Sequence, residues 1–148
     1  MIASFFVDEC CDAKTMENIL VKSAPVYFEC GLTEFLLTCD GENDIIIAKF
    51  LKRAKEFYPM IKVVLYPMQG DKYDESLYDE VNKLPLDGIF LPYAKILRNE
   101  YMVNESSTAF CYFIRNGSPT NAFRAYAMAK TLKKSAIDMI DIYGQWNI

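Results

Sequence analysis

The turn at residues 115–120 has the residue types of an anion-binding site. It contains Gly117, Ser118 and Thr120 between an apolar run and a helix rich in Ala, Met and Lys. Backbone amides at a helix N-terminus lack internal partners and carry partial positive charge, so this turn could hold a phosphate or a carboxylate. The structural alternative is that Ser118 or Thr120 caps the helix and Pro119 begins it.

Acidic residues gather in two further turns and indicate a different chemistry. They are Asp8, Glu9 and Asp12 after the first apolar run, and Asp40, Glu42 and Asp44 after the second. If the two preceding strands are neighbours, the carboxylates converge at one edge of the sheet and could bind a divalent cation. Asp44 or Glu42 could also stabilise the oxocarbenium-like centre of N-glycosidic bond hydrolysis. Solvated turns and helix caps are the alternative.

The chain contains no histidine, which excludes several kinds of chemistry. Ser-His-Asp catalysis, Cys-His catalysis and histidine metal sites all need an imidazole. The five cysteines lack zinc-ligand spacing, and we predict no bound metal and no cofactor. We expect reduced thiols, with Cys30, Cys39 and Cys111 in the core, whereas Cys10 or Cys11 could be a reactive thiol.

Three arginines and one asparagine are further candidates for ligand contacts. A guanidinium group has the planar geometry that pairs with phosphate, so Arg98, Arg115 and Arg124 are candidate phosphate partners. A surface ion pair is the alternative for each of them. Asn99 could orient a ligand or order a turn.

Apolar segments that alternate with helical patterns must position these residues. We expect strands at residues 2–7, 34–39, 61–66, 88–91, 108–114 and 136–142, and helices at 13–28, 43–57, 73–84, 94–104 and 120–134. The strands are almost continuously apolar, which is typical of a parallel sheet covered on both faces. We therefore predict the α/β class: one domain over residues 1–148, with a Rossmann-like, doubly wound, mainly parallel sheet of five to six strands and helices on both faces.

The loops at the carboxyl ends of these strands are the expected ligand site. In an open parallel sheet a ligand binds beyond these ends, where the winding reverses. We expect the loops at residues 39–44 and 117–120 to project from the same edge. Gly41 and Gly117 stand next to predicted helix starts, but neither belongs to a GxGxxG or GxxxxGK[ST] pattern.

Composition and charge limit the possible partners. The net charge of −4 gives no support for binding to nucleic acid or to an anionic membrane. The longest apolar runs fall well short of the roughly 20 residues that a membrane helix needs. The N-terminal apolar run meets Asp8 and Glu9 without a preceding basic region, so it indicates a first strand rather than a secretory signal. We expect a cytoplasmic protein.

The chain resembles the SLOG superfamily over about residues 2–142, in particular its YpsA-like family of unknown function. The most specific element is residues 98–104, which read RNEYMVN and are similar to the RN-x-x-M-V-D/N element of that family. Tyr58-Pro59 before an apolar strand, and a later turn with Gly117 and Thr120, follow in the same order. The resemblance implies a Rossmann-like fold related to the Lonely Guy and DprA proteins.

Three turns depart from the family's pattern. Residues 8–11 read DECC where the family has a Thr-Gly-His-Arg-like motif. Thr38, Cys39 and Glu42 stand where the family has glycines, whereas Asp44 matches the family's aspartate. The turn at residues 117–123 lacks the glutamate of the related hydrolases. Because a close backbone approach to phosphate depends on such glycines, the resemblance implies a nucleotide pocket with degenerate glycine motifs.

We therefore expect a protein that binds a nucleotide or nucleotide-derived ligand at the carboxyl edge of the sheet, and a non-catalytic sensor is one form that such a protein can take. The predicted contacts are Arg98 and Asn99 as orienting side chains, Gly117, Ser118 and Thr120 as anion donors, and Asp44 at a ribose or a metal. A nucleotide N-glycosidic bond hydrolase is one alternative, with Asp44 or Glu42 as the catalytic carboxylate. The other is a protein–protein interaction module with a vestigial pocket, since ten Tyr and ten Phe leave room for an aromatic interface and a homo-oligomer.

Overall fold

Six parallel strands form the sheet of this protein, in the order β4-β3-β2-β1-β5-β6. The computed structural model describes residues 1–115 and 119–141. The strands are β1 (Ile2–Val7), β2 (Glu34–Leu37), β3 (Lys62–Leu65), β4 (Glu80–Val81), β5 (Thr108–Tyr112) and β6 (Ser135–Asp138). Every neighbouring pair of strands is parallel. The predicted α/β class is confirmed, with a sheet that is parallel throughout.

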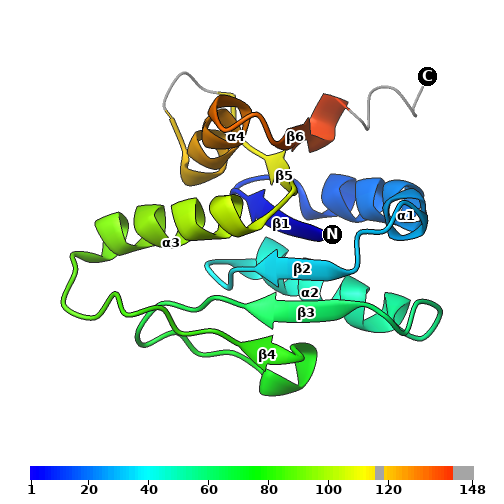
Figure 1. The fold of residues 1–148 in the computed structure, drawn as a ribbon, viewed down its shortest axis with the longest axis horizontal. Helices are drawn as coiled ribbons and strands as arrows, with labels where there is room; N and C mark the ends of the chain where they lie inside the picture. Colours follow the sequence, from blue (N-terminus) through cyan, green and yellow to red (C-terminus); the bar gives the residue numbers. More distant parts are fainter. Residues whose placement is uncertain (116–118, 142–148) are drawn as a thin grey trace.

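Helices cover both faces of the sheet. In the described part of the chain they are α1 (Ala13–Glu29), α2 (Glu42–Ala54), α3 (Leu91–Glu105) and α4 (Asn121–Thr131), with a short 3-10 helix η1 (Glu75–Leu77). Successive strand residues point to opposite faces, so Phe5 packs with α1 and α2 while Phe6 packs with α3 and α4. Figure 1 shows α3 crossing in front of the sheet and α2 lying behind it. This is the predicted doubly wound arrangement.

The ends of α1 and α2 follow from local chemistry. Asp12 caps α1 by accepting a hydrogen bond from Thr15 N at 3.0 Å. Helix α2 has acidic residues in its first turn, near the positive pole of the helix dipole, and basic residues in its last turn, near the negative pole, and both arrangements are stabilising. Among the helices that the structure describes, none is long and apolar enough to cross a membrane.

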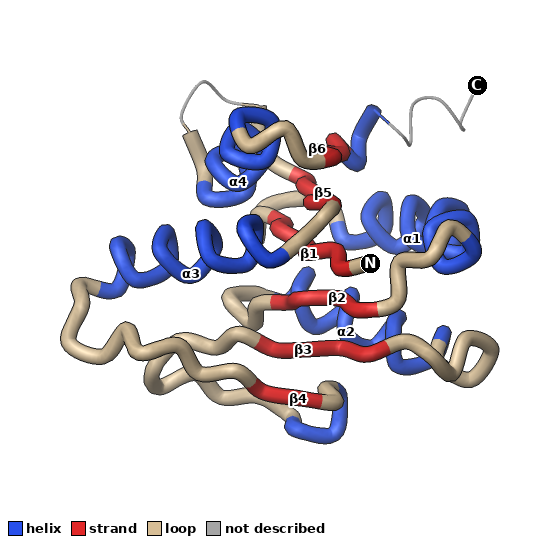
Figure 2. The backbone as a smooth tube through the Cα atoms, viewed as in Figure 1, coloured by secondary structure: helices blue, strands red, loops and turns tan. Residues whose placement is uncertain are grey.

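The winding of the sheet reverses between β1 and β5. From β1 the chain moves outward through β2, β3 and β4, and then returns through α3 to β5 on the other side of β1. The segments that follow β1, β2 and β5 therefore leave the sheet at one edge, its carboxyl edge, beside this reversal. Figure 2 shows in tan the long loop that joins β4 to α3 at the same edge.

The predicted helix at residues 73–84 is wrong. In this stretch η1 is a single helical turn, and Glu80 and Val81 pair with β3 as the edge strand β4. The Asp79 carboxylate accepts a hydrogen bond from Val63 N at 2.8 Å, which ties the stretch to β3. In this arrangement Tyr78 is buried and Leu77 and Val81 pack against the core, so pairing with the sheet outweighs the helix propensity of the stretch.

The predicted strand at residues 88–91 is also wrong. Gly88 lies in a turn with a φ of 82°, and Phe90 is the N-cap of α3, which begins at Leu91. Pro92 falls in the first turn of α3, where its missing N–H leaves no hydrogen bond unmade. Helix α3 is therefore longer than the predicted helix at residues 94–104. Strand β6 is shorter than predicted and ends at Asp138, after which residues 139–141 are helical.

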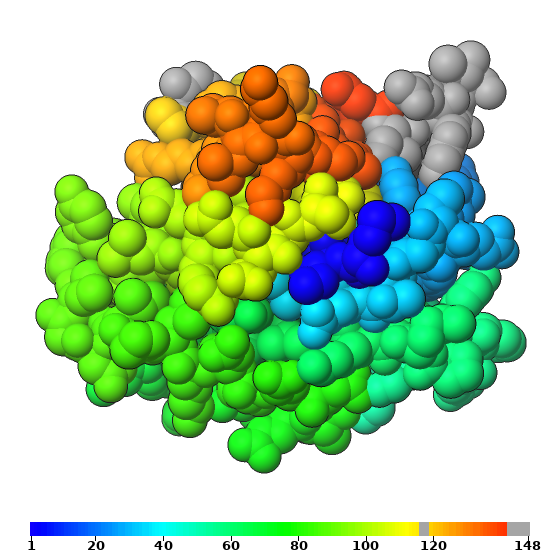
Figure 3. Space-filling model, in the orientation of Figure 1, coloured from blue at the N-terminus to red at the C-terminus, as the bar shows by residue number. Residues whose placement is uncertain are grey.

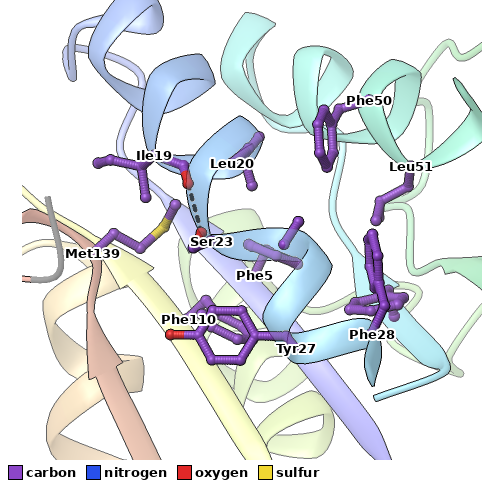
Figure 4. A pocket seen from close by; sticks show the side chains of 12 residues that line it. Phe5, Ile19, Leu20, Ser23, Tyr27, Phe28, Phe50, Leu51, Phe110 and Met139 are labelled. Carbon is purple, nitrogen blue, oxygen red and sulfur yellow. Dashed lines mark hydrogen bonds between the residues drawn. The ribbon is translucent and has the colours of Figure 1, made fainter. Parts of the chain in front are cut away.

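A small apolar cavity of about 10 Å³ lies between the sheet, α1 and α2. Figure 4 shows Phe5, Phe110 and Tyr27 at its wall, and Phe110 stacks on Phe5 with ring centroids 4.9 Å apart. The Ser23 hydroxyl donates to Ile19 O at 2.5 Å and is satisfied within α1. The cavity is close to the smallest volume that holds one water, so it is a packing void and not a ligand site.

Candidate functional site

A polar cleft of about 240 Å³ lies at the carboxyl ends of β1 and β2, close to the reversal of the winding. Helix α3 and the first turn of α4 form its other walls. Apart from the apolar end of β1, each of the four segments contributes two residues to the lining. They are Asp8 and Glu9 after β1, Thr38 and Asp40 after β2, Lys95 and Asn99 on α3, and Asn121 and Ala122 on α4. The cleft is therefore built from segments that are distant in the sequence.

Asp8 holds the turn after β1 against the segment that follows β5. Its carboxylate accepts a hydrogen bond from Ile114 N at 2.9 Å, and its backbone N–H donates to Tyr112 O at 3.0 Å. The Asn43 side chain donates to the carbonyl oxygens of Asp8 and Cys11, each at 3.1 Å. Asp8 and Asn43 therefore shape this wall of the cleft.

Arg98 is buried beneath the cleft and pairs with Asp40. Its Nη1 and Nη2 donate to the two carboxylate oxygens of Asp40 at 3.0 and 2.6 Å, and its Nε donates to Asn99 Oδ1 at 3.0 Å. The side chain is 0 % exposed, so Asp40 balances its charge inside the protein. Arg98 does not line the cleft; it positions Asn99 and Asp40, which do.

Asp44 is buried in the first turn of α2 and holds the turn after β2. Its Oδ2 accepts hydrogen bonds from Thr38 Oγ1 and from Asp40 N, both at 2.8 Å. Burial raises the pKa of Asp44 to about 6, although the hydrogen bond from Thr38 lowers it. Asp44 does not line the cleft, so this geometry makes it a support for the turn rather than a wall of the site.

Glu9 and Lys95 are the charged cleft residues left for a ligand. Within residues 1–115 and 119–141 neither of them makes a hydrogen bond or an ion pair, whereas Asp8 and Asp40 are engaged. Glu9 packs against Gly41, where an added Cβ would lie 2.5 Å from Glu9 Cγ. The cleft in the described chain therefore offers an unengaged carboxylate and an unengaged ammonium group.

A second hollow of about 240 Å³ adjoins the cleft between α3 and α4. It shares Asn99 and Asn121 with the cleft and adds Glu100 and Arg124. The Arg124 side chain is exposed, and its Nη1 lies 3.5 Å from Asn121 Oδ1. Ligand pockets usually measure about 300–1,000 Å³, and the volumes of the two hollows added together fall in this range.

Two other predicted residues lie apart from the cleft. Arg115 is exposed, stacks over the Phe113 ring at 4.6 Å and pairs with Asp138. Glu42 is exposed in the first turn of α2. Across the described ranges no group of three or more His, Cys, Asp or Glu side chains could hold a metal ion. The two acidic turns therefore do not form a cation site there.

The cysteine thiols are free and mostly unreactive by environment. Burial raises the pKa of Cys11 to about 11 and that of Cys39 to about 12, so neither thiol ionises near neutral pH. Cys111 is buried, as predicted. Cys30 is exposed, which corrects its expected place in the core, because it follows the last turn of α1 on the solvent side.

Thr120 caps α4, which is one of the two roles predicted for it. Its Oγ1 accepts a hydrogen bond from Phe123 N at 3.2 Å, and the helix begins at Asn121. Pro119 therefore precedes the cap and does not begin the helix as predicted. Gly117 and Ser118, predicted with Thr120 as anion donors, lie outside the described residues.

Replacing Thr120 by alanine is expected to lower the free energy of unfolding by about 1 kcal/mol, because Phe123 N loses its acceptor. Urea unfolding followed by circular dichroism measures this difference. Thr120→Ser keeps the hydroxyl group and is expected to change stability little. Equal losses for the two variants would show that the cap contributes nothing.

Sequence reasoning missed Lys95 and Asn121 as cleft residues. Lys95 precedes Asn99 by one helical turn, so helical spacing from Asn99 places it on the same face and could have found it. Asn121 follows the Thr120 cap directly but carries no signal of its own. The pairing of Arg98 with Asp40 joins residues 58 positions apart, and no local pattern indicates it.

A comparison with protein-family models and with curated proteins finds no match to this chain. The resemblance to the SLOG superfamily therefore stays a prediction from the residues quoted above. The class that the structure defines is an α/β protein with an all-parallel, doubly wound sheet and a polar cleft at its carboxyl edge.

Proposed function

We propose that this protein binds a nucleotide or a nucleotide-derived small molecule in the cleft between β1, β2, α3 and α4. The observation that supports this most is the presence of an unengaged carboxylate, Glu9, and an unengaged ammonium, Lys95, in a polar cleft beside the reversal of the winding. Doubly wound parallel sheets bind ligands at this position. A nucleotide carries hydroxyl groups that donate and phosphate oxygens that accept, which suit the two side chains.

Lys95 and the N-terminus of α4 form the anion side of the cleft. Asn121 and Ala122 are the first two residues of α4, at the positive pole of the helix dipole. The Asn99 amide oxygen already accepts from Arg98 Nε, which leaves its amide nitrogen as a donor for a ligand. A phosphate group at this side meets an ammonium group, an amide donor and a helix N-terminus.

Glu9, in the turn after β1, forms the hydroxyl-binding side. An ionised carboxylate accepts hydrogen bonds and donates none, so it favours the hydroxyl groups of a ribose and repels a phosphate. We therefore orient the ligand with its sugar at Glu9 and its phosphate at Lys95. The adjoining hollow with Arg124 has room for a further part of a larger ligand.

Binding without turnover fits this geometry better than hydrolysis does. Asp44 and Glu42, the carboxylates predicted for an N-glycosidic hydrolase, do not line the cleft. Glu9 is the remaining unengaged carboxylate among the described cleft residues, so a hydrolase would depend on it. Release of free base from nucleoside monophosphates, abolished by Glu9→Gln, would favour the enzyme; binding with no release favours the sensor.

Lys95→Gln is expected to weaken the binding of AMP at least tenfold, or about 1.4 kcal/mol, and to leave adenosine binding unchanged. Only AMP carries the phosphate that Lys95 would contact. Isothermal titration calorimetry at low salt measures both ligands, and Lys72→Gln, an exposed lysine in the loop after β3, is the matched control. Equal weakening of AMP and adenosine would refute the assigned orientation.

Failure of the wild type to bind any of AMP, ADP-ribose and cyclic dinucleotides would refute the proposed function itself. Glu9→Gln separates the two sides of the cleft further. It is expected to weaken AMP and adenosine to a similar degree, because both carry the ribose hydroxyls.

A further inference from the structure

Helix α3 is apolar on two opposite sides. On the inner side Met102 and Val103 are buried against the sheet. On the outer side Tyr93 is 65 % exposed, and Leu97 and Tyr101 are each 39 % exposed. These three residues are spaced by four, so they form one stripe along the helix.

Such an outer face is unusual for a helix on a protein surface. A surface helix has charged and polar residues opposite its buried face, whereas a helix that is apolar all round is normally buried. Phe90, the N-cap of α3, extends the apolar surface at 74 % exposure. Figure 3 shows the N-terminal part of α3, in light green, at the surface with no other element over it.

We propose that a second copy of this chain covers the outer stripe of α3, in a two-fold symmetric dimer centred on Leu97. The stripe Tyr93–Leu97–Tyr101 reads the same in both directions. When two copies of α3 cross antiparallel with Leu97 on the two-fold axis, Tyr93 of each copy lies near Tyr101 of the other. A symmetric dimer needs such a self-complementary patch, and an unrelated partner does not.

The lack of charge on the stripe and the fixed position of one of its rings agree with this pairing. Positions 93, 97 and 101 carry no charge, so the stripe itself brings no like charges together in a chain with a net charge of −4. The Tyr101 ring also packs on the buried Tyr66 with a centroid distance of 5.9 Å, so its position is largely set before association. A fixed aromatic side chain loses little conformational entropy on binding.

The exposed area matches a weak, concentration-dependent dimer. With about 150–250 Å² for a whole aromatic side chain, the exposed parts of Phe90, Tyr93, Leu97 and Tyr101 amount to roughly 400–500 Å² per copy. Pairing then buries roughly 800–1,000 Å² in total before neighbouring residues are included, which is below the roughly 1,200 Å² of standard stable interfaces and in the range of weak complexes. Association should therefore depend on concentration. Lys95 and Asn99 line the cleft from another side of α3, so this inference does not depend on the proposed function.

Sedimentation velocity of the full chain from about 1 to 200 µM tests the dimer. We expect the wild type to shift from monomer to dimer over this range, and Leu97→Glu to raise the midpoint concentration at least tenfold. Val26→Glu, at an apolar residue of α1 that is 50 % exposed, is the matched control and should leave the midpoint unchanged. A wild type that stays monomeric, or a dimer that Leu97→Glu leaves intact, overturns the proposal.

Crosslinking tests the symmetry independently of any effect of Leu97→Glu on folding. In a background with Cys10→Ser and Cys30→Ser, Leu97→Cys is expected to give a covalent dimer with a short bismaleimide, because the axis brings the same residue of both copies together. Val26→Cys should give none. Crosslinking of both variants to the same extent overturns the proposal. Flotation of the wild-type monomer with phosphatidylcholine vesicles also overturns it, because that result would assign the stripe to a lipid surface.

Discussion

Replacing Arg98 by methionine is expected to lower the free energy of unfolding by about 3–5 kcal/mol. Arg98 has the largest side chain among the fully buried residues of the described chain, and its guanidinium group donates two hydrogen bonds to Asp40. Without it the Asp40 carboxylate keeps its charge at the edge of the interior, and Asn99 Oδ1 loses its donor. The Asp40 side chain is 23 % exposed, so water recovers part of the loss and favours the lower end of this range.

Urea unfolding at pH 7 measures this loss through the midpoint and the slope of the transition. Lys62→Met is the control, because Lys62 also pairs with carboxylates, those of Glu34 and Glu80, but is largely exposed. Exposed ion pairs contribute about 0–1 kcal/mol, so we expect a small change. A loss for Arg98→Met as small as that for Lys62→Met would show that burial does not strengthen the Asp40 pair.

The partner variant Asp40→Asn adds a double-mutant cycle. Each single change leaves one charged group without its partner, whereas the double variant leaves neither charge behind. The double variant is therefore expected to be more stable than the sum of the two single losses predicts. Additive losses would mean that the two side chains stabilise the protein separately.

Asp44→Asn is expected to change the pH dependence of stability by about 2 kcal/mol between pH 4 and pH 7, which is most of the full effect of about 3 kcal/mol. The pKa of Asp44 is about 6 in the folded protein and 3.8 without the protein environment, and burial is the main cause of the increase. The two values differ by about two pKa units, each worth about 1.4 kcal/mol.

The sign follows from where the proton is bound. Between pH 3.8 and about 6 the folded protein retains the Asp44 proton that the unfolded chain has released. Stability therefore falls as the pH rises through this window, and the ionised buried carboxylate is a cost at pH 7. Asparagine does not titrate, yet it can accept the hydrogen bonds from Thr38 Oγ1 and Asp40 N. The stability of Asp44→Asn relative to the wild type should rise from pH 4 to pH 7.

Urea unfolding at pH 4, 5, 6 and 7 measures this difference, and Asp79→Asn is the control. Burial raises the pKa of Asp79, but the hydrogen bonds from Lys55 and Val63 N outweigh it and hold the pKa below its ordinary value. The ionised Asp79 adds stability as the pH rises to its unfolded pKa of 3.8 and adds little beyond it, so between pH 4 and pH 7 Asp79→Asn should show a nearly constant stability difference from the wild type. A flat difference for Asp44→Asn would disprove the raised pKa.

The sequence alone determined the layers of this protein. Runs such as residues 2–7 and 108–114 are apolar at nearly every position, so they must be buried on both faces, and the helical segments between them require parallel crossovers. The caps at Asp12 and Thr120 could also be predicted, because a cap depends on a side chain and amides within three residues. The carboxyl edge as the place of the cleft followed from the same alternation.

Tertiary structure decided what each charged residue does at that edge. The sequence suggested Arg98 and Asp44 as ligand contacts, but both side chains are buried and bind other protein groups. Arg98 pairs with the Asp40 carboxylate, and Asp44 accepts hydrogen bonds from Thr38 Oγ1 and Asp40 N. Likewise β4 exists because the edge of β3 was available to pair, against the local preference for a helix. Periodicity and capping act within a few residues of the chain, and sequence shows them. Burial and charge pairing depend on groups brought together by the whole fold, so only the folded structure left Glu9 and Lys95 as the unengaged charges of the described cleft.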